Sequence, residues 1–356
     1  MNSWVLRRVQ FIGSITAPGS GHGGETIKNR LLLEYIDGRF REVVQIDTVA
    51  AMRNPLRFGL GLLRAFLGRN DDLVVLSAAT RSACRLIRIL GLLDVHGKQV
   101  LYLVIGGTLV ERVRDRFISL DALRRVDAIY IESKVLCDAL TGMGLGHVRH
   151  LTNFKRTRGF DPMWGAHSAT LRLVFVSRVI PEKGIEILAG VVARMVREGM
   201  AVTLDIFGPA EPVCLESVIR LAGETERIYY GGILDLVGDG RADAYQMLAG
   251  YDYMVLPTFH YGEGFPAALI DAFIAGLPVI TTRWNSNAEC VQHGVNGFLV
   301  EPKSADDLYR CLTGEARDNP RHAEMRCRAR EAAALYDIDY VLGPVFYGLD
   351  AAEVGA

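Results

Sequence analysis

Short apolar runs alternate with longer amphipathic segments along the whole chain of 356 residues. This alternation is typical of parallel sheets whose strands are joined by crossover helices, and strands covered on both faces are almost continuously apolar. In the first half, the predicted strands are Val9–Ile15, Val43–Thr48, Leu73–Ser77, Val100–Ile105, Ala128–Glu132 and Val148–Leu151. In the second half, they are Leu171–Ser177, Val202–Phe207, Ile228–Tyr230, Tyr253–Pro257, Pro278–Thr282 and Gly297–Val300.

Between the two sets of strands lies a stretch with Gly, Pro, Trp and mixed charge but no clear period, which is typical of a linker. The chain is also long enough for two domains with a core each. We therefore predict an α/β protein with two Rossmann-like domains, residues 1–152 and 171–338, joined by a linker at 153–170. The apolar, helix-like segment 339–356 is expected to return to the first domain.

The composition favours a cytoplasmic protein. No stretch approaches 18 uninterrupted apolar residues, and the N-terminal segment lacks the apolar region of a signal peptide. The six cysteines show no disulfide framework or zinc-binding spacing, so we expect core residues in a reducing compartment and no metal site.

The charge is divided between the halves of the chain. Residues 1–160 carry 24 Lys and Arg against 14 Asp and Glu, a net of +10, whereas residues 161–356 carry 16 against 27, a net of −11. The basic half is expected to face something anionic. No nucleic-acid-binding motif is present, so an anionic membrane surface is the better candidate.

One segment of the basic half has the composition of a membrane-interface helix. Residues 51–69 combine many apolar side chains with Arg53, Arg57, Arg64 and Arg69. A partly buried helix with snorkelling arginines has the same pattern. The charge of the half-chain favours peripheral membrane contact.

Glu263 and Asp271 mark the most informative stretch of the chain. Glu263 stands in a Gly/Pro loop, and a helix is predicted to begin at Pro266, with Asp271 about two turns after Glu263. Free amides in the first turn favour a phosphate. This stretch offers the parts of a nucleotide-sugar pocket: Glu263 for sugar hydroxyls, Asp271 for a ribose and a helix dipole for a diphosphate. Helix capping and a solvated helix face are the structural alternatives.

A glycine-rich loop follows the first predicted strand. Pro18–Thr26 contains four glycines and precedes a predicted helix at Ile27–Tyr35, so its backbone can approach a ligand closely. The loop is neither a P-loop nor an exact dinucleotide-binding fingerprint. His22 is equally consistent with a donor to a phosphate or acceptor hydroxyl and with an exposed loop residue.

Two cations follow the strand at Leu171–Ser177. Arg178 and Lys183 stand at the carboxyl end of a predicted parallel strand, where ligands bind in open α/β sheets. There they would offset the charge of a leaving diphosphate. Solvated surface charges are the alternative for either residue alone. Gly208, after the next strand, either borders the nucleotide or forms a turn.

The second half resembles the retaining GT-B glycosyltransferases of glycosyltransferase family 4, the glycosyl transferases group 1. The motifs that carry this resemblance are Ser177-Arg178, Pro181–Gly184, Phe207-Gly208, Tyr230-Gly231, Glu263–Pro266 with Asp271, Ala275–Ile280 and Asn296–Val300. The resemblance covers about residues 170–315, whereas the first half matches only through Gly23-Gly24 and its strand pattern.

The resemblance implies a GT-B fold, two facing Rossmann-like domains with parallel sheets, and a role for each matching residue. Arg178 and Lys183 would hold the diphosphate, Glu263 the donor sugar and Asp271 the ribose. The other donor-site residues implied are Gly23, Gly24, Gly208, Gly264, Phe265 and Pro266.

The sequence departs from the family pattern at two informative places. Asp271 stands where a Glu is usual, and the segment Val104–Thr108 lacks the His that many relatives carry near the reacting centre. Thr108 and backbone amides are candidates to replace that His on the acceptor side.

We therefore expect a retaining, metal-independent glycosyltransferase without a separate cofactor, using a UDP- or GDP-sugar and a glycan or lipid-linked acceptor. Bacterial surface polysaccharide synthesis at the inner face of the membrane is the expected setting, and nucleic acid is not an expected partner. The alternatives are a nucleotide-sugar 2-epimerase of the same fold and a non-catalytic nucleotide-sugar-binding subunit.

Overall fold

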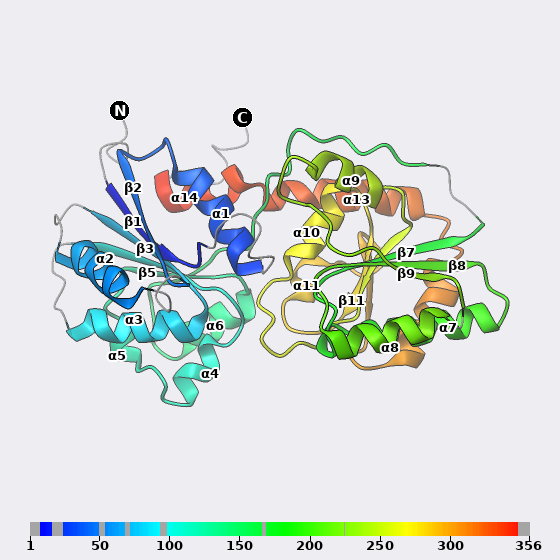
Figure 1. Ribbon diagram of the computed structural model, residues 1–356, viewed down its shortest axis with the longest axis horizontal. Helices are drawn as coiled ribbons and strands as arrows, with labels where there is room; N and C mark the ends of the chain where they lie inside the picture. The colour runs from blue at the N-terminus through cyan, green and yellow to red at the C-terminus, as the bar shows by residue number, and fades with distance from the viewer. Residues whose placement is uncertain are drawn as a thin grey trace. The chain divides into compact units, whose positions relative to one another are not determined.

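The computed structural model describes residues 8–15, 24–49, 54–67, 72–92, 98–165, 169–223 and 225–347. The chain forms two compact units (Figure 1). The first comprises Met1–Phe154, Gly262–Phe265 and Ile338–Ala356, and the second comprises Lys155–Tyr261 and Pro266–Asp337. Most of the segment predicted as a linker is thus grouped with the second unit, and the C-terminal segment with the first.

The first unit is built on a parallel sheet in the order β2-β1-β3-β4-β5-β6. Its strands are β1 (Arg8–Gly13), β2 (Glu42–Asp47), β3 (Leu73–Ser77), β4 (Gln99–Leu103), β5 (Ala128–Ile131) and β6 (Val148–His150). In β1, Ile12 lies opposite Ile46 of β2 on one side and Leu76 of β3 on the other.

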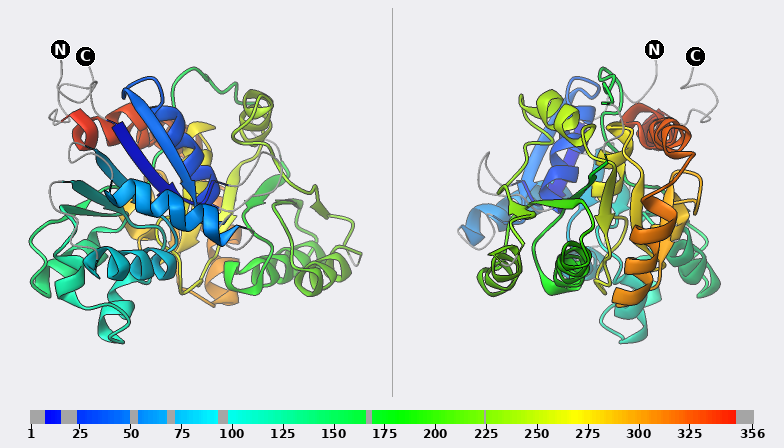
Figure 2. Two further views of the ribbon diagram at one scale, coloured as in Figure 1. Left: turned by 60° about the vertical axis from the view of Figure 1, so that its left-hand side comes forward. Right: turned by 90° about the vertical axis from the view of Figure 1, so that its right-hand side faces the viewer.

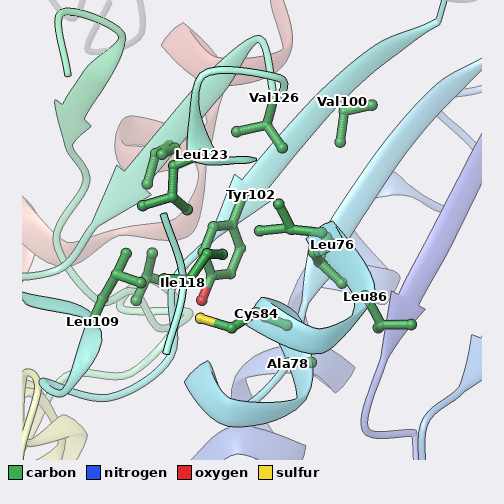
Figure 3. Close-up of a cluster of buried hydrophobic side chains, with 14 of the residues drawn as sticks. Leu76, Ala78, Cys84, Leu86, Val100, Tyr102, Leu109, Ile118, Leu123 and Val126 are labelled. Carbon is green, nitrogen blue, oxygen red and sulfur yellow. The ribbon is translucent and has the colours of Figure 1, made fainter. Parts of the chain in front are cut away.

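Helices cover both faces of this sheet. They are α1 (Gly24–Ile36), α2 (Pro55–Leu67), α3 (Thr80–Leu92), α4 (Leu109–Arg114), α5 (Leu120–Leu123), α6 (Lys134–Gly142) and α14 (Ile338–Tyr347). Helices α2, α3 and α6 share one buried cluster, part of which is shown around Tyr102 and Cys84 in Figure 3. Helices α1 and α14 share the cluster on the other face (Figure 2, left).

The second unit contains a parallel sheet in the order β12-β11-β10-β7-β8-β9. Its strands are β7 (Leu171–Val176), β8 (Val202–Phe207), β9 (Ile228–Tyr230), β10 (Tyr253–Leu256), β11 (Val279–Thr282) and β12 (Gly297–Val300). Strands β7, β8 and β9 lie side by side in chain order. The next strand, β10, pairs with the opposite side of β7, so the order of the strands reverses there.

The helical elements of the second unit connect and cover these strands. They are η3 (Pro181–Lys183), α7 (Ile185–Arg197), α8 (Pro212–Gly223), α9 (Arg241–Leu248), α10 (Ala267–Ile274), α11 (Asn287–Cys290), α12 (Ala305–Arg310), η4 (Cys311–Ala316), α13 (His322–Ala333) and η5 (Ala334–Tyr336). Helix α7 packs against α8, and α10 packs against α9 and α13. No helix among the described residues is long and apolar enough to cross a membrane.

The predicted fold class is confirmed, and each of the twelve predicted strands has a counterpart. Two helix starts differ from the prediction. Helix α1 begins at Gly24, three residues before the predicted Ile27. Helix α10 begins at Ala267, because Pro266 has extended backbone angles (φ −71°, ψ 105°) and acts as the N-cap. His22, Gly23, Arg53 and Arg69 lie outside the described residues.

Thiol reactivity tests the core. Five cysteines are buried and Cys327 is exposed. Burial raises the pKa of the Cys84 and Cys214 thiols to about 11 and the pKa of Cys311 to about 12. At about pH 8, near the ordinary thiol pKa, we expect Ellman's reagent to modify one thiol rapidly in the native protein and all six after unfolding. Rapid modification of several thiols in the native protein would contradict this packing.

A glycine-to-alanine pair tests the junction between η3 and α7. Gly184 has φ 75°, and an added Cβ would lie 2.2 Å from the Pro257 carbonyl oxygen. We expect Gly184→Ala to lower the free energy of unfolding by more than the about 1–3 kcal/mol typical of a strained backbone. The matched control is Gly190→Ala in α7, which has open space at its Cβ position and should gain about 0.5–1 kcal/mol. Urea unfolding followed by circular dichroism measures both, and equal effects would contradict the structure.

Candidate active site

The strand order of the second unit reverses between β7 and β10. Such a topological switch point leaves a crevice beyond the carboxyl ends of the two strands, because the following crossovers leave in opposite directions. The two strands are paired only at Leu173–Tyr253 and Val174–Met254. The loops that follow them therefore carry the candidate chemistry of this unit.

Arg178 and His260 meet above this switch point. Arg178 follows β7 and is exposed, whereas His260 follows β10 and is half-buried. Their nearest nitrogens, Arg178 Nη2 and His260 Nε2, are 3.5 Å apart. The two loops are also joined by their backbones, because Phe259 N donates to the Glu182 carbonyl oxygen over 2.8 Å. The exposed guanidinium of Arg178, on a loop that this backbone contact fixes, is well suited to bind a phosphate through two parallel hydrogen bonds.

Lys183 provides a second cation in the same loop, at the end of η3. Its side chain is buried, with 5% relative exposure. A buried ammonium acts in a medium of lower dielectric than water, so its attraction for an anion is stronger than that of a surface lysine. The left-handed Gly184 directly after it turns the chain into α7.

Gly208 lies at the end of β8, against the end of β7. Its φ is 140°, and an added Cβ would lie 1.8 Å from the Ser177 carbonyl oxygen. The Tyr230 hydroxyl donates to the Gly208 carbonyl oxygen over 2.9 Å. This close approach explains why a side chain is absent at position 208, next to the loop that bears Arg178.

The segments that follow β10, β11 and β12 contribute residues that were not predicted from the sequence. Trp284 Nε1 donates to the His260 carbonyl oxygen over 3.0 Å. The Lys303 ammonium lies 4.9 Å from the centre of the Phe259 ring. The only signal in the sequence for this loop is His260, which follows a predicted strand. Trp284 and Lys303 come from later segments of the chain, so their contacts with it could not be predicted.

Asp271 lies on the buried side of α10, with 3% relative exposure. Its Oδ1 atom is 3.1 Å from Lys155 Nζ and accepts a 2.8 Å hydrogen bond from the Tyr245 hydroxyl. Burial raises the pKa of Asp271, an effect that Lys155 and Tyr245 oppose. Lys155 and Tyr245 thus both contact Oδ1, and the contact of Asp271 with a ribose stays a prediction. Neither Lys155 nor Tyr245 was identified from the sequence.

Glu263 belongs to a short segment, Gly262–Phe265, that is grouped with the first unit. The segment lies against the end of β4, where Gly107 N donates to the Gly262 carbonyl oxygen over 3.3 Å. A Cβ on Gly107 would lie 2.4 Å from the Glu263 carbonyl oxygen. This contact accounts physically for glycine at position 107, in the region where many relatives carry a His. Thr108 follows at once as the N-cap of α4.

A buried ion pair holds the same segment from the other side. Lys28 Nζ is 2.5 Å from Glu132 Oε1, and both side chains are almost fully buried. Glu132 Oε2 accepts a 3.1 Å hydrogen bond from Phe265 N. Glu132 was predicted only as the last residue of a strand, and nothing in its spacing to Lys28 predicted the pair.

The predicted site residues thus fall into two groups. Arg178, Lys183, Gly208, Pro266 and Asp271 belong to the second unit. Gly24, Thr108, Glu263, Gly264 and Phe265 belong to the first unit. Within the second unit, Arg178, Lys183 and Gly208 stand at the carboxyl edge of the sheet, which can hold and neutralise a polyanion.

Sequence comparison finds relatives of the second unit. Residues 170–314 match the family model described as Glycosyl transferases group 1, which confirms the resemblance predicted from the motifs. A glycogen synthase of Pseudomonas syringae pv. syringae (strain B728a) is 29% identical over 161 residues, covering 44% of this chain and 31% of the relative. A glycogen synthase of Xanthomonas campestris pv. campestris (strain 8004) is 28% identical over 137 residues, covering 38% and 27%. The chain thus spans about a third or less of the length of these relatives.

Solved structures share the fold of the whole chain. The sucrose-phosphate synthase of Thermosynechococcus elongatus has a TM-score of 0.75 at 15% identity, covering 97% of this chain and all of that one. Anabaena HepE in complex with UDP-glucose has a TM-score of 0.70 at 18% identity, covering 96% of this chain and all of that one. The fold is therefore GT-B, as predicted.

The buried pair of Lys155 and Asp271 offers a test by double substitution. Removing one partner leaves the other charge uncompensated, so we expect Lys155→Met or Asp271→Leu to lower the free energy of unfolding by about 3–5 kcal/mol. The double variant Lys155→Met/Asp271→Leu should lose much less than the sum, because neither charge remains. Chemical unfolding measures all three variants.

The exposed pair Arg194–Glu198 provides the control, and Glu198→Gln should change stability less than either single variant of the buried pair. Additive losses in the double variant would show that Lys155 and Asp271 do not act as a pair.

Proposed function

We propose that this protein transfers a glycosyl group from a nucleotide sugar to a glycan or lipid-linked acceptor, with retention of configuration at the anomeric carbon. The observation that carries the proposal is the pair of cations, Arg178 and Lys183, at the switch point of the second sheet. They lie inside the segment that matches the Glycosyl transferases group 1 model.

The two cations suit complementary tasks. The exposed Arg178 guanidinium would grip the diphosphate with paired hydrogen bonds. The buried Lys183 ammonium would stabilise the charge that develops on the phosphate oxygen as the bond to the sugar breaks, because fixed charges in a low-dielectric site need no reorganisation.

The remaining donor-site residues follow the family resemblance. Glu263 would accept hydrogen bonds from the sugar hydroxyls, and Asp271 Oδ2 would accept from the ribose. Small or apolar residues at 208, 264, 265 and 266 would allow close approach of the backbone to the donor. Gly23 and Gly24 would approach the phosphates, and His22 and Thr108 are the acceptor-side candidates.

The proposed reaction exchanges one bond at the anomeric carbon for another on the same face. The bond from the anomeric carbon to the diphosphate oxygen breaks, and the acceptor oxygen forms its bond there. The acceptor's proton passes to the departing phosphate oxygen, so no protein nucleophile is required. Arg178 and Lys183 would supply the charge stabilisation that a divalent metal supplies in other transferases.

The donor and the setting are parts of the same proposal. A UDP- or GDP-sugar is expected as donor, and the UDP-glucose complex of Anabaena HepE supports the UDP-sugar. Surface polysaccharide synthesis at the cytoplasmic face of a bacterial membrane is the proposed setting. The basic first half of the chain supports that location.

Donor turnover tests the proposal. The purified chain is incubated with a panel of UDP-, GDP- and ADP-sugars, and release of free nucleotide is followed. We expect slow turnover of one donor, with the released sugar keeping the donor's anomeric configuration in proton NMR spectra recorded before it mutarotates.

Substitutions connect turnover to the proposed residues. Arg178→Ala, Lys183→Ala and Glu263→Ala should each lower turnover by about 100- to 1,000-fold, the usual effect of losing one group that stabilises the transition state. Arg220→Ala, an exposed arginine on α8, is the matched control and should keep full turnover.

The remaining outcomes separate the alternatives. A donor that raises the melting temperature without turnover, even with added acceptor glycans, would favour a non-catalytic binding subunit. Appearance of the C2 epimer of the donor sugar would favour an epimerase. Neither turnover nor a thermal shift with any donor would contradict the donor site.

A further inference from the structure

Helix α2 presents an apolar stripe on its outer face. Leu56, Leu60 and Leu63 have relative exposures of 80%, 56% and 45%. Residues spaced by four and then three positions lie on one face of a helix, and this stripe is about 10 Å long. The opposite face is used for packing, because Leu62 and Ala65 are buried in the cluster beneath α2.

The stripe belongs to a helix that is fixed at both ends. Asn54 Oδ1 accepts a 3.1 Å hydrogen bond from Arg57 N, and Pro55 is the first helical residue, so the N-terminus is capped. Near the C-terminus, the buried Lys98 ammonium donates to the Ala65 carbonyl oxygen. Rotation of α2 to bury the leucines would break these contacts.

Exposed arginines lie on α2 and on α3. Arg57 and Arg64 are exposed on α2 itself. On α3, Arg81, Arg85 and Arg88 are exposed at the same spacing as the leucines, and so form a stripe of their own. Helices α2 and α3 cover the same face of the first sheet and share one buried cluster (Figures 1 and 2). Neither helix contains an acidic residue.

Another helix shows that exposed apolar residues alone are not distinctive. Helix α8 exposes Val213 and Ile219 with relative exposures of 81% and 53%. Their surroundings include the exposed Glu211 and Glu216 rather than a row of arginines. The combination of a leucine stripe with an arginine stripe therefore sets the α2–α3 face apart.

We propose that the outer face of α2, flanked by the arginines of α3, docks on a lipid bilayer that contains anionic lipids. The leucines would enter the boundary between headgroups and acyl chains, and the arginines would contact lipid phosphates. A second copy of the chain fits this face less well, because an isologous dimer would bring two arginine-rich surfaces together. A nucleic acid would leave the leucines without a partner.

Vesicle co-sedimentation tests this proposal with the full-length chain. Vesicles of phosphatidylcholine alone are compared with vesicles that also contain phosphatidylglycerol. We expect binding only to the anionic vesicles, and weaker binding as salt is added, because the attraction between arginines and the surface is screened.

Two sets of substitutions separate the leucines from the arginines. Leu56→Ser/Leu60→Ser/Leu63→Ser should abolish binding, and Arg81→Gln/Arg85→Gln/Arg88→Gln should weaken it by about 100-fold and reduce its dependence on salt. Val213→Ser/Ile219→Ser on α8 is the matched control and should bind as the wild type does. Circular dichroism verifies that every variant is folded.

Other outcomes would overturn the proposal. These are failure of the wild type to bind anionic vesicles, equal binding to neutral ones, or full binding by the leucine variant. Sedimentation velocity addresses the second copy, and a wild-type dimer that the leucine variant converts to a monomer would assign the face to self-association. The experiment needs no donor or acceptor, so its result is independent of the proposed transfer reaction.

Discussion

The short pairing of β7 with β10 is the constraint on which the second unit depends. Strand β7 pairs with β8 along its whole length but with β10 at only two positions. The loops that contain Arg178 and His260 follow these two strands at the carboxyl edge. Backbone contacts such as Phe259 N to the Glu182 carbonyl oxygen then hold these loops at a fixed distance. The loops that carry the two cations are thus positioned by contacts of the backbone.

Glycines make this arrangement possible at two places. Gly208 at the end of β8 lies against the Ser177 carbonyl oxygen, and Gly184 at the start of α7 lies against the Pro257 carbonyl oxygen, each so close that a Cβ would clash. Both glycines belong to the family motifs recognised in the sequence, and the structure supplies a physical reason for them. Gly208 permits close approach between the ends of β7 and β8, and Gly184 permits close approach between the start of α7 and the end of β10.

The fold could be predicted from the sequence because burial is encoded locally. Strands covered on both faces are continuous apolar runs, so β3 and β10 could be recognised without knowledge of their neighbours. The contacts of the candidate site, by contrast, join residues from distant segments of the chain. The partners of Asp271 come from the segment predicted as a linker and from α9, and the partner of Glu132 comes from α1. No periodicity specifies which buried cation meets which buried carboxylate, so these pairs could not be predicted.

The exposed face of α2 and the chemistry of the first unit are connected by sheet topology. Every helix that follows a strand in a parallel sheet begins at the carboxyl edge of that sheet. Helices α2 and α3 follow β2 and β3, so both start at the edge where Gly107 contacts the Glu263 segment. A bilayer bound along α2 and α3 would therefore reach the edge of the first unit that bears Thr108. Within that unit, a lipid-linked acceptor would then have its lipid anchored along the helices and its sugar at the carboxyl edge.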